Sequence, residues 1–197
     1  MTARRDVPMS ADLRDRILDA LRALLDQRTF DSLSVAEIIA AAGVSRASFY
    51  FYFPGKQAAL AELVRRAVGQ GHDAAEPWVS GTIDPREALR RGIDAGAGLW
   101  LANAGVLRAI VESWGSDLQL RALWLAQMDT FTQATLARIT PLADRLPGVD
   151  LPALAASLTW LGERLYYLAA SRVPPFDDRK VLVDTLLHLW TTALRET

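Results

Sequence analysis

The spacing of hydrophobic residues along the chain predicts a protein made of helices. From Ser10 onward, apolar residues return every three or four positions, which places them on one face of a helix. No segment shows the alternation of apolar and polar residues that is typical of a strand, and no internal repeat is present. We therefore expect an all-α fold, with a short helix after Ser45 and longer ones near residues 10–25, 35–42, 56–68, 85–102, 106–114, 118–139, 152–171 and 178–194.

Residues 33–60 contain two short predicted helices separated by a tight turn. Ser34 suits the N-cap of the first helix because its hydroxyl can accept a hydrogen bond from a free N–H of the first turn. Gly43 suits the end of that helix because glycine adopts the left-handed conformation without strain. Ser45 then begins the second helix. Two helices joined so closely cross steeply, as they do in a helix-turn-helix.

The second of these helices carries side chains suited to reading DNA. Its first turn offers Arg46, Ala47 and Ser48, and this is the end that enters the major groove in a helix-turn-helix. An arginine there can contact a guanine edge, and the two small residues can contact a thymine methyl group or a base edge. The pattern therefore predicts a small surface that reads bases.

The residues that follow can anchor this surface on the DNA backbone. Tyr50 and Tyr52 add hydroxyl groups, and Lys56 opens the next helix, where a cation and free backbone N–H groups can meet one phosphate. No acidic residue lies between Glu37 and Glu62, although the net charge of the whole chain is −1. The site is thus locally basic on a nearly neutral protein.

Some residues of this region also have a purely structural interpretation. Ser45 can serve as a helix cap alone, and the three phenylalanines of the aromatic run suit a buried core: Phe49, Phe51 and Phe53. At the N-terminus, Arg4 and Arg5 can either reach a minor groove or belong to a solvated tail.

Composition limits the classes of function. The chain has 197 residues, of which 51% are hydrophobic, and this allows a small N-terminal module and a larger core. It has no cysteine, and its two histidines, His72 and His188, have no other ligand at metal-binding spacing. No nucleophile–base pair or phosphate loop is present, so we expect no enzyme, no cofactor and no metal site. We see no signal peptide or membrane segment and expect a soluble, cytoplasmic protein.

Breaks in the helical pattern divide the chain into four expected parts. These are a flexible arm over residues 1–9, a helix-turn-helix DNA-binding domain over 10–55, a connector helix and loop over 56–80, and a ligand-binding and dimerisation domain over 81–197. Residues 69–71 read Gly-Gln-Gly and are expected to weaken the connector helix.

The last two helices are apolar around most of their circumference. Residues 151–170 carry only Glu163 and Arg164 as charges, and residues 181–190 carry only Asp184. Such helices are buried on more than one side, so we expect one side to face the protein core and the other a second copy. The resulting four-helix interface would place two reading helices on a palindromic DNA site.

All six tryptophans lie beyond residue 70, and two interpretations of them stay open. Large rings often fill a core. Tryptophans spread over several helices, beside small residues such as Gly92, Gly96, Gly98 and Gly162, also suit a deep apolar pocket.

The segment SVAEIIAAAGVSRASFYFYFPGKQAAL resembles the N-terminal DNA-binding domain of the TetR family of bacterial repressors. The resemblance rests on the A-G-V-S start of the second helix, the aromatic-Tyr pair, a further aromatic residue and the lysine just beyond. It implies a TetR-like fold, in which a three-helix DNA-binding domain precedes a larger helical domain. By this resemblance, the DNA contacts fall on Ser34, Ser45, Arg46, Ala47, Ser48, Tyr50, Tyr52 and Lys56.

The end of the chain, LGERLYYLAASR with VDTLLHLWTTAL, is similar to a mycobacterial member of this family that has a long hydrophobic ligand channel. Two polar positions of that channel fall on Thr159 and Gly162, and one of its phenylalanines falls on Gly96. The aromatic positions that line the channel fall on Trp100, Trp124, Phe131, Tyr167 and Trp190.

Helical spacing assigns two faces to residues 152–171. Glu163 on the pocket face can accept a hydrogen bond from a ligand or form a structural ion pair. The face expected to line the pocket carries Thr159, Gly162, Glu163, Tyr166 and Tyr167. The face expected to meet the second copy carries Leu154, Ser157, Leu161, Arg164 and Leu168.

Together these features predict a homodimeric repressor that binds a palindromic operator in double-stranded DNA and is released by an apolar small-molecule ligand. Two alternatives stay open. One is a TetR-like DNA-binding regulator without a ligand, in which the tryptophans are plain core. The other is a helical carrier of apolar molecules that does not bind DNA.

Overall fold

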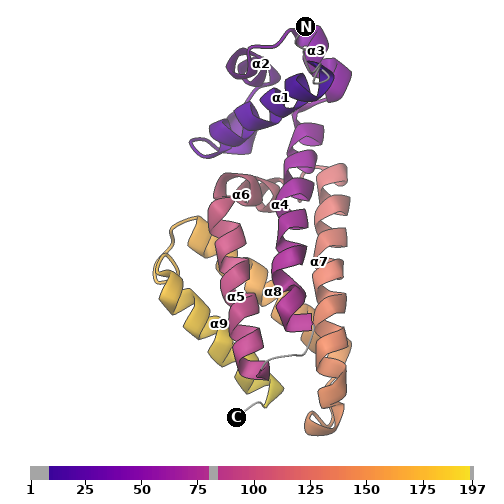
Figure 1. The fold of residues 1–197 in the computed structure, drawn as a ribbon, viewed down its shortest axis with the longest axis vertical. Helices are drawn as coiled ribbons and strands as arrows, with labels where there is room; N and C mark the ends of the chain where they lie inside the picture. Colours follow the sequence, from indigo (N-terminus) through magenta and orange to yellow (C-terminus); the bar gives the residue numbers. More distant parts are fainter. Residues whose placement is uncertain (1–8, 80–83, 196–197) are drawn as a thin grey trace, which may run out of the picture.

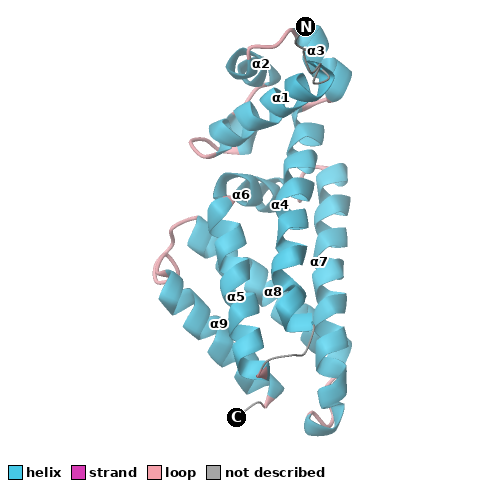
Figure 2. Ribbon diagram, viewed as in Figure 1, coloured by secondary structure: helices cyan, strands magenta, loops and turns pink. Residues whose placement is uncertain are grey.

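The structure is a computed structural model that describes residues 9–79 and 84–195, with side chains described for residues 12–69 and 84–195. Arg4, Arg5 and the side chains of His72 and Trp78 lie outside the described residues. Within the described part the chain is helical, without strands, so the all-α expectation is confirmed (Figures 1 and 2). Its elements are α1 (Met9–Leu25), η1 (Phe30–Ser32), α2 (Val35–Ala42), α3 (Arg46–Tyr52), α4 (Lys56–Val79), α5 (Pro85–Ala102), α6 (Ala104–Ser113), α7 (Leu118–Ile139), η2 (Thr140–Arg145), α8 (Leu151–Ala170) and α9 (Arg179–Leu194).

The helices form a small N-terminal domain on top of a larger helical body. Helices α1, α2 and α3 pack together at one end, and α4 leads from them into the body, where it lies beside α5 and α7 (Figure 1). Helix α6 crosses at the junction between the two parts, and α8 and α9 complete the body. The N-terminal domain is therefore mounted on the body through α4 and α6.

Helix α4 does not weaken at Gly69 as the sequence suggested, but continues to Val79. It packs against α5, α6 and α7 along its course. This packing offsets the roughly 1 kcal/mol that each glycine costs inside a helix relative to alanine. The helix therefore extends beyond the end expected near residue 68, because tertiary contacts outweigh local propensity.

Helix α2 begins with the Ser34 cap that its sequence indicated, and Glu37 extends this cap to a capping box. The Ser34 hydroxyl accepts a hydrogen bond from the Glu37 N–H at 3.2 Å, and the Glu37 carboxylate accepts one from the Ser34 N–H at 2.8 Å. Arg28 adds an ion pair to the same carboxylate. These hydrogen bonds, led by the one from Arg28, lower the pKa of Glu37 to about 2.

Lys56 ties the start of α4 to the turn before α2. Its Nζ donates hydrogen bonds to the carbonyl oxygens of Phe30 at 2.9 Å and Leu33 at 2.7 Å. The same ammonium lies 4.6 Å from the centre of the Phe30 ring, whose side chain is buried. Lys56 thus fixes the η1 turn against the start of α4.

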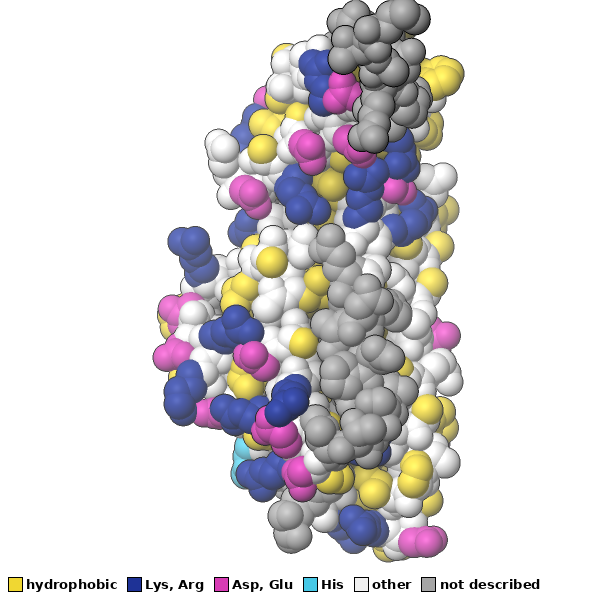
Figure 3. Space-filling view, viewed as in Figure 1, with side chains coloured by type: hydrophobic (Ala, Val, Ile, Leu, Met, Phe, Trp, Pro, Cys, Tyr) yellow, Lys and Arg dark blue, Asp and Glu magenta, His cyan; other side chains and the backbone are white. Residues whose placement is uncertain are grey.

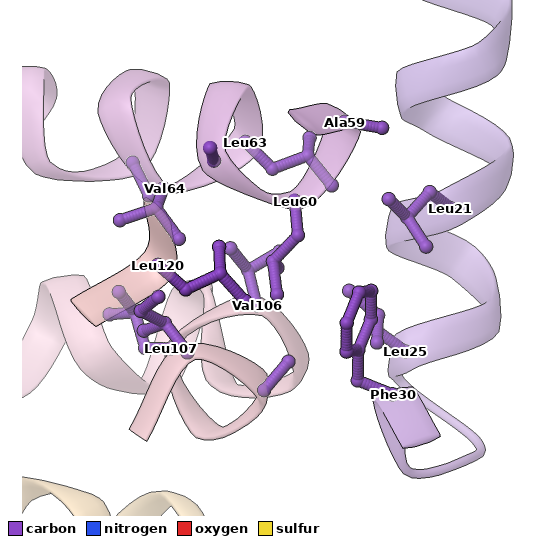
Figure 4. Close-up of a cluster of buried hydrophobic side chains, with 14 of the residues drawn as sticks. Leu21, Leu25, Phe30, Ala59, Leu60, Leu63, Val64, Val106, Leu107 and Leu120 are labelled. Carbon is purple, nitrogen blue, oxygen red and sulfur yellow. The ribbon is translucent and has the colours of Figure 1, made fainter. Parts of the chain in front are cut away.

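A continuous hydrophobic cluster joins the N-terminal domain to the body. Figure 4 shows Leu21, Leu25 and Phe30 facing Leu60 of α4 and Val106 of α6. The same cluster extends deep into the body, where its further members include Trp100, Trp124 and Met128. The two domains therefore share one core.

The backbone of α6 also touches the end of α1 directly. A Cβ atom added to Gly105 would lie 2.7 Å from the backbone carbonyl carbon and oxygen of Leu25, so only glycine fits there. Ion pairs link Arg14 of α1 to Glu62 of α4 at 2.9 Å, and Asp15 of α1 to Arg66 of α4 at 2.8 Å. Figure 3 shows basic and acidic side chains mixed across this junction.

We predict that Lys56→Met lowers the stability of the protein, because the change removes charge-assisted hydrogen bonds to two backbone carbonyls. The expected loss in free energy of unfolding is about 2 kcal/mol, measured by urea denaturation. Arg65→Met is the control, because Arg65 is exposed and makes only a 3.5 Å contact with Glu62. Equal effects of the two substitutions would contradict the structural role of Lys56.

Stability should also depend on Glu37 in a defined pH range. A carboxylate whose folded-state pKa is lowered from 4.5 to about 2 stabilises the fold above about pH 4.5, and this contribution is lost as the pH falls toward 2. We therefore expect Glu37→Gln to have a lower melting temperature than wild type at neutral pH, with the difference shrinking below about pH 4.5. Asp177→Asn, at an exposed loop position, should show no such convergence.

Candidate DNA-binding face and ligand cavity

The first turn of α3 is open to solvent. Ser45, Arg46 and Ala47 are exposed, and Ser48 is half-buried. The Ser45 hydroxyl caps the helix by accepting a hydrogen bond from the Ser48 N–H at 3.0 Å, and the two hydroxyl oxygens lie 2.8 Å apart. Capping leaves these hydroxyls on the surface, so a structural role and a DNA contact are compatible at Ser45.

Arg46 is available for a partner outside the chain. Its guanidinium lies 5.6 Å from the centre of the Tyr50 ring, one turn further along α3. Among the described residues, no carboxylate lies within ion-pair distance of Arg46. The exposed Tyr50 ring therefore orients the arginine without neutralising it.

Phe51 corrects one expectation from the sequence. Phe49 and Phe53 are buried as expected, but 80% of Phe51 is exposed. Residues 49 and 53 are four positions apart and share the inner face of α3, whereas residue 51 lies on the opposite side. The ring of Phe51 packs edge-on against Tyr52, with 5.0 Å between the ring centres.

The Lys56 ammonium extends inward rather than toward solvent, and its contact with a DNA phosphate, which stays a prediction, would require it to leave its carbonyl partners. Its hydrogen bonds run inward to the carbonyls that precede α2. Of the other expected backbone contacts, Ser34 is exposed with its hydroxyl in the capping box, and Tyr52 is half-buried against the core.

A cavity of about 190 Å³ lies in the body between α5, α7 and α8. Helices α4, α6 and α9 contribute Val68, Leu107 and Trp190 to its wall. It is lined by eight of the nine residues expected in the pocket, namely Trp100, Trp124, Phe131, Thr159, Gly162, Glu163, Tyr166 and Trp190. Trp114 and Trp160 lie outside it and pack on one another, with ring centres 6.1 Å apart.

Tyr167 is the exception and does not line the cavity. Its hydroxyl donates a hydrogen bond to Glu112 of α6 at 3.2 Å, and the Arg164 guanidinium lies 5.1 Å from its ring centre. Adjacent residues on a helix point about 100° apart, so Tyr166 and Tyr167 do not face the same space. The assignment of both to the pocket was therefore wrong for Tyr167.

Tyr166 packs across α5 at a position where only glycine fits. Its hydroxyl donates a hydrogen bond to the Ile93 carbonyl at 2.9 Å, and a Cβ atom on Gly96 would lie 2.7 Å from the hydroxyl oxygen. Burial, reinforced by Asp94, raises the pKa of Tyr166 and keeps it neutral. Its ring stacks with Trp100 at 6.3 Å, so the aromatic wall extends from α8 to α5.

Glu163 places a carboxylate in this apolar wall. The residue is 5% exposed, and its contact with the Arg164 Nε is long, at 3.9 Å. Burial raises the pKa of Glu163, while Arg164 and the indole of Trp124 act in the opposite direction. The ion pair with Arg164 is weak because half of the arginine side chain is exposed to water.

Sequence reasoning missed part of the cavity lining. Most of the lining residues that were missed are aliphatic, and the sequence pattern does not distinguish them from ordinary core residues. Thr135 follows Phe131 by four positions on α7, so helical spacing could have identified it. The lining residues not singled out are Val68, Leu89, Ile93, Ala95, Leu99, Leu107, Met128, Ala134, Thr135 and Leu158.

The outer face of α8 and α9 carries apolar residues that the chain does not fully cover. The five residues expected at a dimer interface are all exposed or half-buried, namely Leu154, Ser157, Leu161, Arg164 and Leu168. On α9, Val181 and Leu189 are each 38% exposed.

The described part of the chain offers no group of three or more His, Cys, Asp or Glu side chains that could hold a metal ion. In residues 9–79 and 84–195, no helix is long and apolar enough to cross a membrane.

Two family models match the chain. Residues 17–63 match the bacterial regulatory proteins of the tetR family, and residues 89–195 match the C-terminal domain of the transcriptional regulator EthR. The HTH-type transcriptional regulator EthR of Mycolicibacterium smegmatis is 33% identical over 97% of this chain and 90% of its own length. EthR of Mycobacterium tuberculosis is also 33% identical, over 97% of this chain and 91% of its own.

The fold has close counterparts among solved structures. The TetR-family transcriptional regulator PfmR from Thermus thermophilus superposes with a TM-score of 0.70 at 22% identity, covering 92% of this chain and 98% of that one. Helix-turn-helix geometry, sequence relatives and fold thus agree, and the chain belongs to the TetR family of DNA-binding transcriptional regulators.

Proposed function

We propose that the protein is a homodimeric repressor that leaves a palindromic operator when an apolar small molecule fills the cavity between α5, α7 and α8. One observation carries this proposal. The hydrophobic cluster that lines the cavity with Trp100, Trp124 and Met128 also contains Leu21 and Leu25 of α1. A ligand that moves the cavity wall therefore acts on the same packed core that positions the N-terminal domain.

The DNA-reading surface in this proposal is the exposed side of α3. Arg46 and Ala47 are the candidates for base contacts, and Ser45, Ser48, Tyr50 and Tyr52 surround them. Phe51 joins this surface because its ring is exposed beside Tyr52. The backbone at the start of α4, rather than the Lys56 ammonium, is the part of that helix free to meet a phosphate.

The second copy in this proposal packs on the outer face of α8 and α9. Leu161 and Leu168 on α8, together with Val181 and Leu189 on α9, leave apolar area on that face. Such area is usually covered in a stable assembly. A four-helix interface there would set the separation of the two α3 helices on DNA.

The effect of ligand follows from differential binding. A ligand that favours the conformation with low DNA affinity needs about 1–3 kcal/mol of coupling between the two sites to change operator occupancy. The close contact between Gly105 and Leu25 leaves the N-terminal domain little freedom to move independently of α6. A rearrangement around the cavity would thus change the position of α3.

The operator can be found by selection from random DNA with the purified protein, followed by electrophoretic mobility shift. We expect Arg46→Ala to weaken operator binding about 10- to 100-fold and to relax the preference at one base pair in each half-site, because a bidentate arginine–guanine contact is lost. Arg91→Ala, on α5, is the control and should bind as wild type does. Unchanged affinity and preference in Arg46→Ala would overturn the assignment of α3 as the reading helix.

The dimer is tested by charge insertion on the outer face of α8 and α9. We expect the wild-type protein to sediment as a dimer in analytical ultracentrifugation, and Ser157→Arg combined with Leu189→Arg to sediment as a monomer, because two cations would be buried without partners. Leu118→Arg changes an 83% exposed leucine on α7 and should leave the dimer intact. A double variant that stays dimeric places the interface elsewhere.

A further inference from the structure

The polar groups in the cavity wall differ in whether they have well-aligned hydrogen-bond partners within the protein. The Thr159 hydroxyl donates to the Ala155 carbonyl at 2.9 Å, and the Tyr166 hydroxyl donates to the Ile93 carbonyl at 2.9 Å. The hydroxyl oxygens of Thr135 and Thr159 lie 3.4 Å apart and share a hydrogen bond. These three hydroxyl groups are therefore engaged within the protein.

Two further polar groups in the cavity wall, the Trp124 indole N–H and the Glu163 carboxylate, interact with each other without good hydrogen-bond geometry. Trp124 is 2% exposed, and its indole N–H has no acceptor with hydrogen-bond geometry among the described residues. Glu163 is 5% exposed, and its nearest cation is the Arg164 Nε at 3.9 Å. A buried donor or acceptor without a well-aligned partner is destabilising, so a ligand group that forms good hydrogen bonds with both is favoured here.

The Trp124 indole N–H and the Glu163 carboxylate need different hydrogen-bonding atoms from a ligand. The indole N–H can only donate, so it needs an acceptor. The Glu163 carboxylate accepts, so it needs a donor. A ligand head that offers both atoms satisfies the pair, whereas an ammonium group leaves the indole without a partner.

The charge of Glu163 also excludes one class of ligand. A second carboxylate placed in this apolar wall would meet a like charge with little water to screen it. The Arg164 guanidinium is about half exposed and too distant to neutralise both. An alkyl chain with an anionic head is therefore disfavoured relative to the same chain with a neutral head.

We propose that the cavity selects apolar molecules with a neutral head group that both donates and accepts hydrogen bonds, a primary carboxamide or an alcohol, and discriminates against carboxylates. Trp124 and Glu163 are the residues that set this preference. The inference rests on the proposed function, because it takes the cavity as the ligand site.

Matched alkyl probes test the preference without knowledge of the natural ligand. Binding of octanamide, octan-1-ol and octanoate to the full-length protein is measured by isothermal titration calorimetry at about pH 8. We expect octanamide and octan-1-ol to bind the wild-type protein at least about tenfold more tightly than octanoate.

Two substitutions then separate the roles of the residues. Glu163→Gln keeps the shape and removes the charge, so octanoate should gain about tenfold while octanamide changes less than about threefold. Trp124→Phe keeps an aromatic ring and removes the N–H, so octanamide should lose about three- to tenfold. Trp114→Phe, which changes a tryptophan outside the cavity, should leave both affinities unchanged. Thermal melting checks that each variant is folded. The ratio of octanamide to octanoate affinity in the wild-type protein tests the preference without any variant.

Each failure has a distinct meaning. If the wild-type protein binds octanoate as tightly as octanamide, the proposed preference is wrong although the cavity still binds ligands. If none of the three probes binds, the preference and the ligand-responsive part of the proposed function both fall. Operator binding and its dependence on Arg46 are measured separately and are affected by neither result.

Discussion

The N-terminal domain is held against the body by a backbone contact that leaves no room for a side chain. At Gly105, the first turn of α6 meets the last turn of α1 so closely that a single methyl group would overlap the Leu25 carbonyl. The shared hydrophobic core and the ion pairs between α1 and α4 surround this contact. Close packing of this kind transmits displacement, because the parts cannot move separately without opening a void. The placement of α3, and hence of the residues proposed to read DNA, depends on it.

The cavity owes its shape to aromatic side chains held by specific contacts rather than to loose packing. Tyr166 lies over Gly96 and is fixed by its hydrogen bond to Ile93, and Trp100 packs between Tyr166 and Trp124. A Phe at position 96, as the resemblance implied for the channel of a relative, would collide with Tyr166. Gly96 and Tyr166 therefore depend on each other, and together they give the cavity wall a shape that a phenylalanine at position 96 would not allow.

The sequence alone predicted the features that depend on short-range physics. Helix starts at Ser34 and Ser45, the left-handed Gly43 and the all-α fold follow from local capping and spacing. Eight of the nine residues that were assigned to the pocket from a resemblance combined with helical spacing line the cavity. Phe51 and Tyr167 were misplaced because the sequence does not show which way a side chain points, and the inward course of the Lys56 ammonium was not foreseen for the same reason. Which way a side chain points depends on neighbours far away in sequence, such as the carbonyls near Phe30 for Lys56 and Glu112 for Tyr167.

The inward course of the Lys56 side chain affects how many DNA counterions the protein is expected to displace. Protein–DNA affinity falls with salt according to the number of phosphate counterions that the protein displaces. If the Lys56 ammonium keeps its bonds to the backbone carbonyls on DNA, it displaces no counterion, and a count of the basic residues near α3 then exceeds the number of counterions released per subunit. In that case, discrimination by the proposed reading helix depends less on attraction to the phosphates and more on the fit of Arg46, Ala47 and the aromatic rings. It should then persist at ionic strengths that weaken more strongly charged binders.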